Sequence, residues 1–150
     1  MESQIRTVRV SEVGRDQLIK LKRVTGIDQW NILCRWALCR SLAEEHPPSP
    51  TPIKEWSNVE MSWAVFAGSY SDALLLLLRQ RAAEHGLSGD EAAITDQLRL
   101  HLHRGIATLA ATALSVPEGT PRGHDRIGWE PLVAQVLAEL DTAAPRVFLL

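Results

Sequence analysis

Lysine and arginine side chains are unevenly distributed along this 150-residue chain, and they are the first candidates for chemistry. The first 40 residues carry eight of them against four aspartates and glutamates, whereas the remainder carries eight against fourteen. The overall formal charge of −2 conceals this asymmetry. A basic segment joined to an acidic remainder suits a protein that meets a polyanion with one face, although a solvated helix face has the same composition.

Two of these cations share one face of a predicted helix. Ser11 suits the N-cap of this helix, and Gly26 suits the left-handed position after its last turn. At 100° per residue, Lys20 and Arg23 lie within about 60° of each other and opposite Leu18. They are therefore expected to project together into solvent, where a phosphate can be met.

Neighbouring residues modify this face. Asp16 precedes Lys20 by four residues, which is the spacing of an intrahelical ion pair that would partly neutralise the lysine. Arg15 and Lys22 flank the apolar side of the same helix, as is typical of long side chains whose aliphatic stems cover the rim of a core. We therefore expect the charge of this helix to be offered mainly by Lys20 and Arg23.

The turn after this helix is a second feature that suits an anion. Residues 25–28 lead directly into another predicted helix, and the first backbone N–H groups of a helix have no partner within it. Such an N-terminus binds anions, and Lys22 and Arg23 lie beside it. Asp28 counts against the site because, as the predicted N-cap residue, it would occupy the same donors. A plain loop is the alternative.

The cysteines and histidines lack the spacing of a metal or redox site. Cys34 and Cys39 are five residues apart in one predicted helix, about 140° around its axis, so they cannot hold one ion or form a disulfide within it. We interpret them as buried structural thiols. His101 and His103 lie on nearly opposite sides of another predicted helix, whereas a zinc pair on one helix needs four-residue spacing. We therefore expect no metal.

The sequence contains no recognised catalytic motif. There is no G-x-S-x-G turn, no P-loop and no G-x-G-x-x-G run. We therefore expect that the chain is not an enzyme and that it uses no cofactor. Its five tryptophans could stack on the bases of single-stranded nucleic acid, but Trp30 and Trp36 lie in the most apolar helix and are typical of a core.

The remaining pattern predicts a mainly α-helical domain with a short N-terminal strand. Residues 4–10 alternate and are rich in β-branched side chains, which favours a strand that must pair, for instance with a second copy of itself. Residues 29–42 predict a helix that is apolar nearly all round, which indicates burial in a core and at the subunit interface of a homo-oligomer. Further helices are expected over residues 71–84 and 89–114.

The chain is less regular between these helices. The prolines of residues 47–52 make a stiff, extended linker. Residues 54–60 suit one helical turn and residues 60–67 suit a short strand. After that strand, Ser71 or Asp72 is expected to cap the next helix.

The composition changes again near the C-terminal end. Proline, glycine and charged residues dominate residues 115–128, and an amphipathic helix is expected from Pro131. We therefore divide the chain into a helical domain of residues 1–115 and a linker with a C-terminal helical extension of residues 116–150. The first residues lack the apolar run of a secretory leader, and no stretch is apolar for long enough to span a bilayer, which predicts a cytoplasmic protein without membrane contact.

Two runs of residues carry a resemblance to a known family. They are Leu21–Ile27, with the sequence L-K-R-V-T-G-I, and Asn31–Cys39, with the sequence N-I-L-C-R-W-A-L-C. Together with Trp63–Phe66 and Gly68–Tyr70, they resemble the DndE family of DNA phosphorothioation proteins over residues 5–115. The order strand, helix, glycine-containing turn, helix is separately similar to a ribbon-helix-helix DNA-binding module.

The resemblance to the DndE family implies a function that composition could not show. Dnd systems replace a non-bridging phosphate oxygen of DNA with sulfur, and DndE resembles an accessory subunit rather than the catalyst. Members of the family form homotetramers and bind double-stranded DNA, with a preference for nicked duplex, through surface lysines. The partners implied are therefore double-stranded DNA, other Dnd sulfur-modification proteins and further copies of the chain.

Seven cations are the predicted DNA-binding residues: Arg6, Arg9, Arg15, Lys20, Lys22, Arg23 and Arg35. The last four lie at positions similar to basic residues of the family, whereas the first three extend the patch on physical grounds alone. We therefore predict a non-catalytic DNA-binding subunit of the phosphorothioation machinery. Two alternatives stay open: a protein–protein adaptor that docks the modification enzymes through its apolar helices, and a ribbon-helix-helix transcriptional regulator that reads bases with a paired strand.

Overall fold

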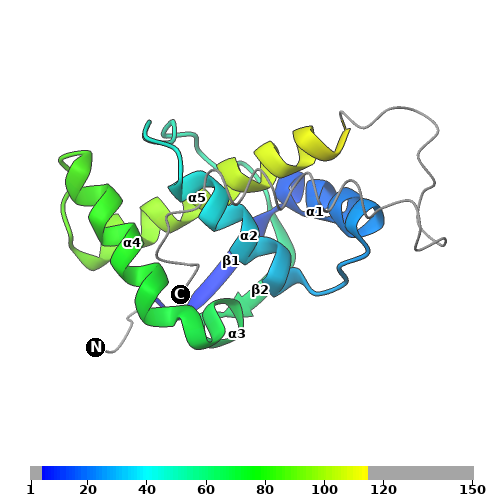
Figure 1. The fold of residues 1–150 in the computed structure, drawn as a ribbon, viewed down its shortest axis with the longest axis horizontal. Coiled ribbons are helices and arrows are strands. Elements are labelled where there is room, and N and C mark those ends of the chain that lie inside the picture. Colours follow the sequence, from blue (N-terminus) through cyan, green and yellow to red (C-terminus); the bar gives the residue numbers. More distant parts are fainter. Residues whose placement is uncertain (1–4, 115–150) are drawn as a thin grey trace.

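A computed structural model describes residues 5–114, which form a two-stranded sheet and a layer of helices. The elements, in chain order, are β1 (Thr7–Ser11), α1 (Glu12–Thr25), α2 (Trp30–Leu42), β2 (Trp56–Ser62), α3 (Trp63–Ala67), the 3-10 turn η1 (Gly68–Tyr70), α4 (Ser71–Glu84) and α5 (Glu91–Leu114). Helix α5 runs through the molecule and packs against α1 and α2, with α4 at one end (Figure 1). The mainly helical prediction is confirmed, while the helix expected from Pro131 lies outside the described residues.

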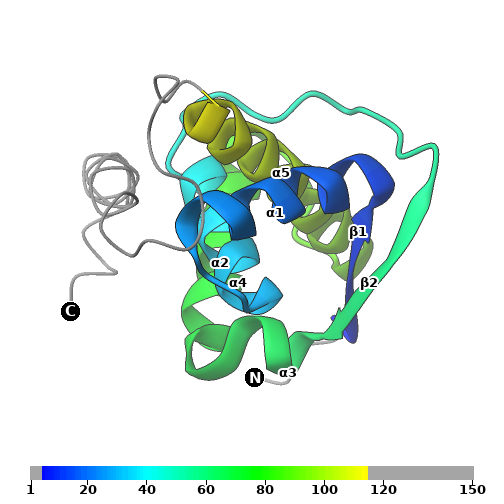
Figure 2. The same cartoon turned by 90° about the vertical axis from the view of Figure 1, so that its right-hand side faces the viewer.

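The two strands form an antiparallel ribbon at one side of the helices (Figure 2). Strand β1 pairs with β2 of the same chain, with Thr7 opposite Ser62 and Ser11 opposite Trp56. The prediction that this strand must pair is therefore confirmed, but its partner is β2 and not the second copy of itself that a ribbon-helix-helix dimer would supply. Its actual partner was hidden because α1, α2 and the linker that follows them separate the two strands in the sequence.

The second strand lies earlier in the chain than the sequence suggests. The helical turn expected over residues 54–60 is wrong, because most of this segment belongs to β2. The strand expected over residues 60–67 ends at Ser62, whose hydroxyl oxygen accepts the N–H of Val65 at 3.2 Å and so caps α3. The N–H of Trp63 then donates to the carbonyl of Arg6 at 2.9 Å, which anchors the first residue of α3 to the chain just before β1.

Both ends of α1 follow local rules. The hydroxyl oxygen of Ser11 accepts the N–H of Gly14 at 3.0 Å, and Gly26 takes the left-handed conformation with a φ of 73° while its N–H donates to the carbonyl of Lys22. The start of α2 differs from the prediction, because Gln29 occupies the N-cap position and makes no side-chain hydrogen bond to the helix. Asp28 is therefore not the cap.

The core lies between α2 and α5 and extends under α1, α3 and α4. Leu18, Leu38 and Phe66 are fully buried within it. The backbones of α2 and α5 approach so closely that a Cβ atom at Gly105 would overlap the carbonyl group of Ala37. As expected from its apolar circumference, α2 has no exposed residue, and its place at a subunit interface stays a prediction.

Residues 43–55 connect α2 to β2 as an extended segment, which we call the strap (Figure 2). Side chains of α5 hold it by its carbonyl groups: Arg99 donates to Thr51 O at 2.9 Å and Arg104 donates to His46 O at 2.7 Å. At its far end, the N–H of Glu12 donates to Glu55 O at 3.1 Å. The proline-rich linker predicted from the sequence is therefore fastened to the fold.

Helices α4 and α5 differ from the expected ones mainly at their starts. Neither Ser71 nor Asp72 caps α4, because Ser71 is already helical and Tyr70 stands at the cap position. At the other end of this helix, His85 is the C-cap residue and Gly86 follows it in the left-handed conformation, with a φ of 70°. None of the described helices is both long enough and apolar enough to cross a membrane.

Candidate nucleic-acid interface

The exposed face of α1 carries two cations that the fold leaves available. Lys20 and Arg23 are both exposed, and neither makes a hydrogen bond, ion pair or ring contact with another described residue. The prediction that they project together into solvent is therefore confirmed as far as exposure goes. Asp16 was expected to neutralise Lys20, but its carboxylate lies 3.7 Å from the guanidinium of Arg15 instead.

Lys22 belongs to the same helix but is already engaged. Its ammonium lies 3.8 Å from the centroid of the Trp30 ring, at the start of α2. This cation–π contact bridges the turn between α1 and α2 and leaves Lys22 only partly exposed. Lys22 therefore reinforces the corner as well as adding to its positive charge.

The turn between the two helices satisfies part of its own backbone. The hydroxyl of Thr25 donates to Leu21 O at 2.7 Å and accepts the N–H of Ile27 at 3.2 Å. The objection that Asp28 occupies the donors at the start of α2 no longer holds, because α2 has no side-chain cap. The anion-binding and plain-loop interpretations of this turn both stay untested.

Arg15 and Arg9 lie apart from this exposed face, on the side of the sheet. The guanidinium of Arg15 donates to the side-chain oxygen of Asn58 on β2 at 3.4 Å. Arg9 lies 4.0 Å from the carboxylate of Glu60, which faces it across the ribbon, and 4.9 Å from the centroid of the Trp56 ring. Both guanidinium groups thus already contact residues of β2 and are less available to an external anion.

Arg6 and Arg35 occupy two further places. Arg6 precedes β1 and is exposed. The guanidinium of Arg35 lies 5.7 Å from the centroid of the Tyr70 ring in η1, and on α2 it is about 140° around the axis from Trp30. The structure therefore does not gather all seven predicted residues: Lys20, Lys22 and Arg23 form one group on α1, which we call the α1 basic face.

Three other arginines, which the sequence did not single out, donate hydrogen bonds to backbone carbonyl groups. Arg81 donates to Leu42 O at 2.7 Å, and Arg104 donates to Ser41 O at 2.9 Å, so that both satisfy carbonyls at the C-terminal end of α2. Arg99 combines its bond to the strap with a 2.6 Å ion pair to Asp96. Arg81 and Arg99 each have an acidic residue three positions away, but this spacing does not identify the carbonyl partners.

The two histidines of α5 point to different neighbours. Nδ1 of His101 lies 2.9 Å from the hydroxyl oxygen of Ser41, which also receives a hydrogen bond from Arg104 at 2.7 Å. Burial, together with the nearby charge of Arg104, lowers the pKa of His101 from its usual 6.5 to about 4. His101 is therefore a neutral core residue that accepts from Ser41, and this serine is too deeply buried to act as a nucleophile.

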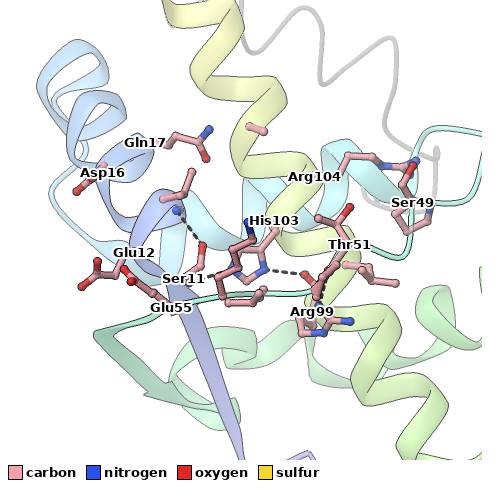
Figure 3. A pocket seen from close by; sticks show the side chains of 18 residues that line it. Ser11, Glu12, Asp16, Gln17, Ser49, Thr51, Glu55, Arg99, His103 and Arg104 are labelled. Atoms are coloured by element: carbon pink, nitrogen blue, oxygen red, sulfur yellow. Dashed lines mark hydrogen bonds between the residues drawn. The ribbon is translucent and has the colours of Figure 1, made fainter.

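His103 faces the start of α1, which confirms that the histidines lie on different sides of the helix. Its Nε2 accepts the N–H of Ser11 at 3.0 Å, and its Nδ1 donates to Arg99 O at 2.7 Å. A cavity of about 720 Å³ opens beside it, between the start of α1, the strap and α5 (Figure 3). Ser11 and His103 line this cavity, but both already use their polar atoms within the fold.

The cysteines do not have the properties of reactive thiols. Burial raises the pKa of Cys34 from 9.0 to about 12 and that of Cys39 to about 11, with Arg35 opposing the shift at Cys39. Neither forms a disulfide, and Cys34 is fully buried. Residues 5–114 contain no cluster of three or more histidine, cysteine or acidic side chains that could hold a metal ion.

The fold and the site define a class: a small, mainly helical protein with an intrachain β-ribbon and a helix whose exposed cations have no partner within residues 5–114. The comparison with family models is specific. The model described as DNA sulphur modification protein DndE matches residues 7–115, more than two thirds of the chain. The chain belongs to the DndE family, and this membership implies involvement in DNA sulfur modification. A search of curated proteins found no match.

Proposed function

We propose that this chain is a non-catalytic DNA-binding subunit of the DNA phosphorothioation machinery and that it contacts double-stranded DNA with the α1 basic face. The observation that carries the proposal is the pair Lys20 and Arg23, which are exposed on one helix face without an acidic partner among the described residues. Phosphates are met by cations of this kind, and the contact needs no base-specific side chain. The protein works as a homo-oligomer, with other Dnd proteins in the cytoplasm.

The seven predicted residues are not equal in this proposal. Lys20 and Arg23 are the principal phosphate ligands, and Lys22 supports them from its position over Trp30. Arg6 and Arg35 are secondary ligands at the margins of the contact. Arg9 and Arg15 contribute least, because each already faces a partner on β2.

A salt-dependent titration tests the proposal. Purified protein is titrated against fluorescent intact, nicked and single-stranded DNA at several salt concentrations, for the native chain and for Lys20→Gln/Arg23→Gln. Loss of two phosphate contacts per protomer should make the slope of log affinity against log salt less negative by about two for each protomer engaged. It should also weaken duplex binding about 50-fold at 0.1 M salt. Salt-independent binding of the native chain would contradict the electrostatic account.

A matched control separates local contact from overall charge. Lys54 is exposed on the strap, beyond the opposite end of α1, and Lys54→Gln removes the same charge as Lys20→Gln. Lys54→Gln should change duplex affinity less than twofold. Equal losses for the two single variants would show that only net charge matters and that α1 is not the interface.

A second function is favoured by a separate observation. Val65, Tyr70 and Leu76 expose more than half of their surface on α3, η1 and α4, and exposed apolar side chains of this kind suit a protein–protein contact. In an adaptor that docks the modification enzymes, Leu76→Asp should weaken capture of purified Dnd partners, whereas the Lys20→Gln/Arg23→Gln variant should not. DNA binding lost in both variants would argue against separate surfaces.

A further inference from the structure

The start of α1 is held by a hydrogen bond that comes from a distant part of the chain. Ser11 is the N-cap residue of α1, and its backbone N–H donates to Nε2 of His103 at 3.0 Å (Figure 3). On the other side of the ring, Nδ1 lies 2.7 Å from the carbonyl oxygen of Arg99, one turn earlier on α5. His103 thus links the beginning of α1 to the middle of α5.

These two partners determine the state of the imidazole. A backbone N–H can only donate, so Nε2 must be the unprotonated nitrogen, and a carbonyl can only accept, so Nδ1 must carry the proton. An imidazolium ion would place an N–H at Nε2 against the N–H of Ser11. The contact with Ser11 therefore requires neutral His103, and burial favours this form by lowering the pKa of the histidine.

The surroundings leave the ring little freedom to move. Trp56 of β2 packs edge-on against His103, with ring centroids 6.1 Å apart. Gly14, in the first turn of α1, lies close enough that a Cβ atom there would be 3.4 Å from Cδ2 of the histidine. Strand, helix and strap meet at this point, because the N–H of Glu12 is also bound, by the carbonyl of Glu55.

We propose that His103 is a positioning residue for the DNA interface: by holding Ser11 on α5, it sets the direction in which α1 presents Lys20 and Arg23. The inference rests on the proposed function. A helix is stiff over this length, and Lys20 lies nine residues, or about 13 Å, beyond Ser11. A tilt of about 10° at the start of α1 would therefore displace the backbone at Lys20 by about 2 Å, enough to misplace a phosphate contact.

His101 provides a matched comparison on the same helix. It is as tightly built into the fold as His103, but its hydrogen bond goes to Ser41 near the C-terminal end of α2 and not to α1. Replacement of a merely structural histidine should lower the stability of the protein, whichever element the side chain contacts. Replacement of a residue that positions α1 should in addition lower the DNA affinity of fully folded protein.

The first experiment measures duplex affinity for His103→Leu, His103→Gln and His101→Leu at one salt concentration, at a temperature where circular dichroism shows each to be folded. We expect His103→Leu to weaken binding about fivefold, a factor that one hydrogen bond can supply. His103→Gln keeps an acceptor near Nε2 and should restore binding, while His101→Leu should bind as the native chain does. Native affinity in His103→Leu, or equal losses in both leucine variants, would overturn the proposal.

A second pair of variants approaches the same bond from its donor, in case His103→Leu does not fold. Ser11 has a φ of −66°, which proline can adopt, so Ser11→Pro fits the backbone conformation. It removes the N–H and places the proline Cδ where the hydrogen pointed at His103, so the ring can no longer hold Ser11 in its place. Ser11→Ala is its control, because both variants lose the hydroxyl that caps α1. Ser11→Pro should bind DNA about fivefold more weakly than Ser11→Ala. Equal affinities would overturn the positioning role, whereas absence of DNA binding by the native chain would overturn the proposed function itself.

Discussion

The cations of α1 and those of α5 have the same chemistry and opposite uses. Lys20 and Arg23 on α1 end in solvent without a partner among the described residues. Arg99 and Arg104 on α5 are bound to carbonyl groups of the strap and of the end of α2. A count of basic residues therefore does not define an interface, because part of that charge already stabilises the fold.

The difference follows from what each helix is packed against. One side of α1 covers the core, whereas Lys20 and Arg23 on its other side contact no other residue of the range 5–114. Helix α5 lies between α1, α2, α4 and the ribbon, where unpaired carbonyl groups of helix ends and of the strap need donors. Changes on α5 should therefore lower stability, and changes on the exposed side of α1 should lower DNA binding.

The largest expected effect concerns the contact between α5 and α2. Gly105→Ala places a methyl group where the carbonyl of Ala37 lies, so the two helices must separate and the core must repack. We expect a loss of about 4 kcal/mol or more in the free energy of unfolding, measured by urea denaturation. Gly89→Ala is the control, because a Cβ atom at Gly89 meets nothing within 4 Å. A Gly105→Ala variant of native stability would contradict the close packing.

The next largest effect is the dependence of stability on pH, because the histidines of α5 are neutral in the folded protein. The pKa of His101 is about 4 when folded and near 6.5 when unfolded, so the unfolded chain binds more protons between these values. Stability should be complete above about pH 6.5 and fall toward pH 4, by about 3 kcal/mol at most from His101, while His103 adds a loss of the same sign.

Urea midpoints measured at several pH values check this dependence. His101→Asn keeps an acceptor near Nδ1 but does not titrate, so its stability should fall less between pH 6.5 and 4 than that of the native chain. The exposed carboxylates Glu84 and Asp90, whose pKa values are lowered by hydrogen bonds, lose their contribution to stability as the pH falls below their ordinary values of 4.5 and 3.8, at or beneath the acid end of this range. A curve unchanged in His101→Asn would contradict the assignment.

The smallest expected changes in the free energy of unfolding are those for removing a cation of α5 or the exposed cations of α1. Arg104→Met leaves carbonyl groups of Ser41 and His46 without their donor and should lower the free energy of unfolding by about 2 kcal/mol. Lys20→Gln/Arg23→Gln breaks no contact among the described residues and should change it by less than about 0.5 kcal/mol. Equal losses, measured by urea denaturation, would remove the distinction between free and bound cations.

Much of the fold depends on signals within a few residues, and these were readable in the sequence. Ser11 and Gly26 mark the ends of α1 because capping depends on neighbouring backbone groups. The apolar circumference of α2 correctly indicated burial. Capping failed as a guide at Asp28 and Ser71, because acceptable cap side chains also occur where the backbone does not use them.

Contacts between distant residues could not be predicted in this way. Strand β2 was mistaken in part for a helical turn, because its identity depends on pairing with β1 and its only buried residue is the polar Ser57. The roles of Arg99, Arg104 and His103 depend on carbonyl and amide groups that lie between 40 and 100 positions away in the chain. Residue type alone does not reveal such partners.

By itself, the sequence determined that the protein is mainly helical, where α1 begins and ends, and that Lys20 and Arg23 share its solvent side, because each of these depends on helical periodicity or on groups within one turn. Only the tertiary structure decided which cations stay free. That outcome depends on where the strap and the end of α2 leave carbonyl groups unpaired, and these groups meet their arginines only after the chain has folded.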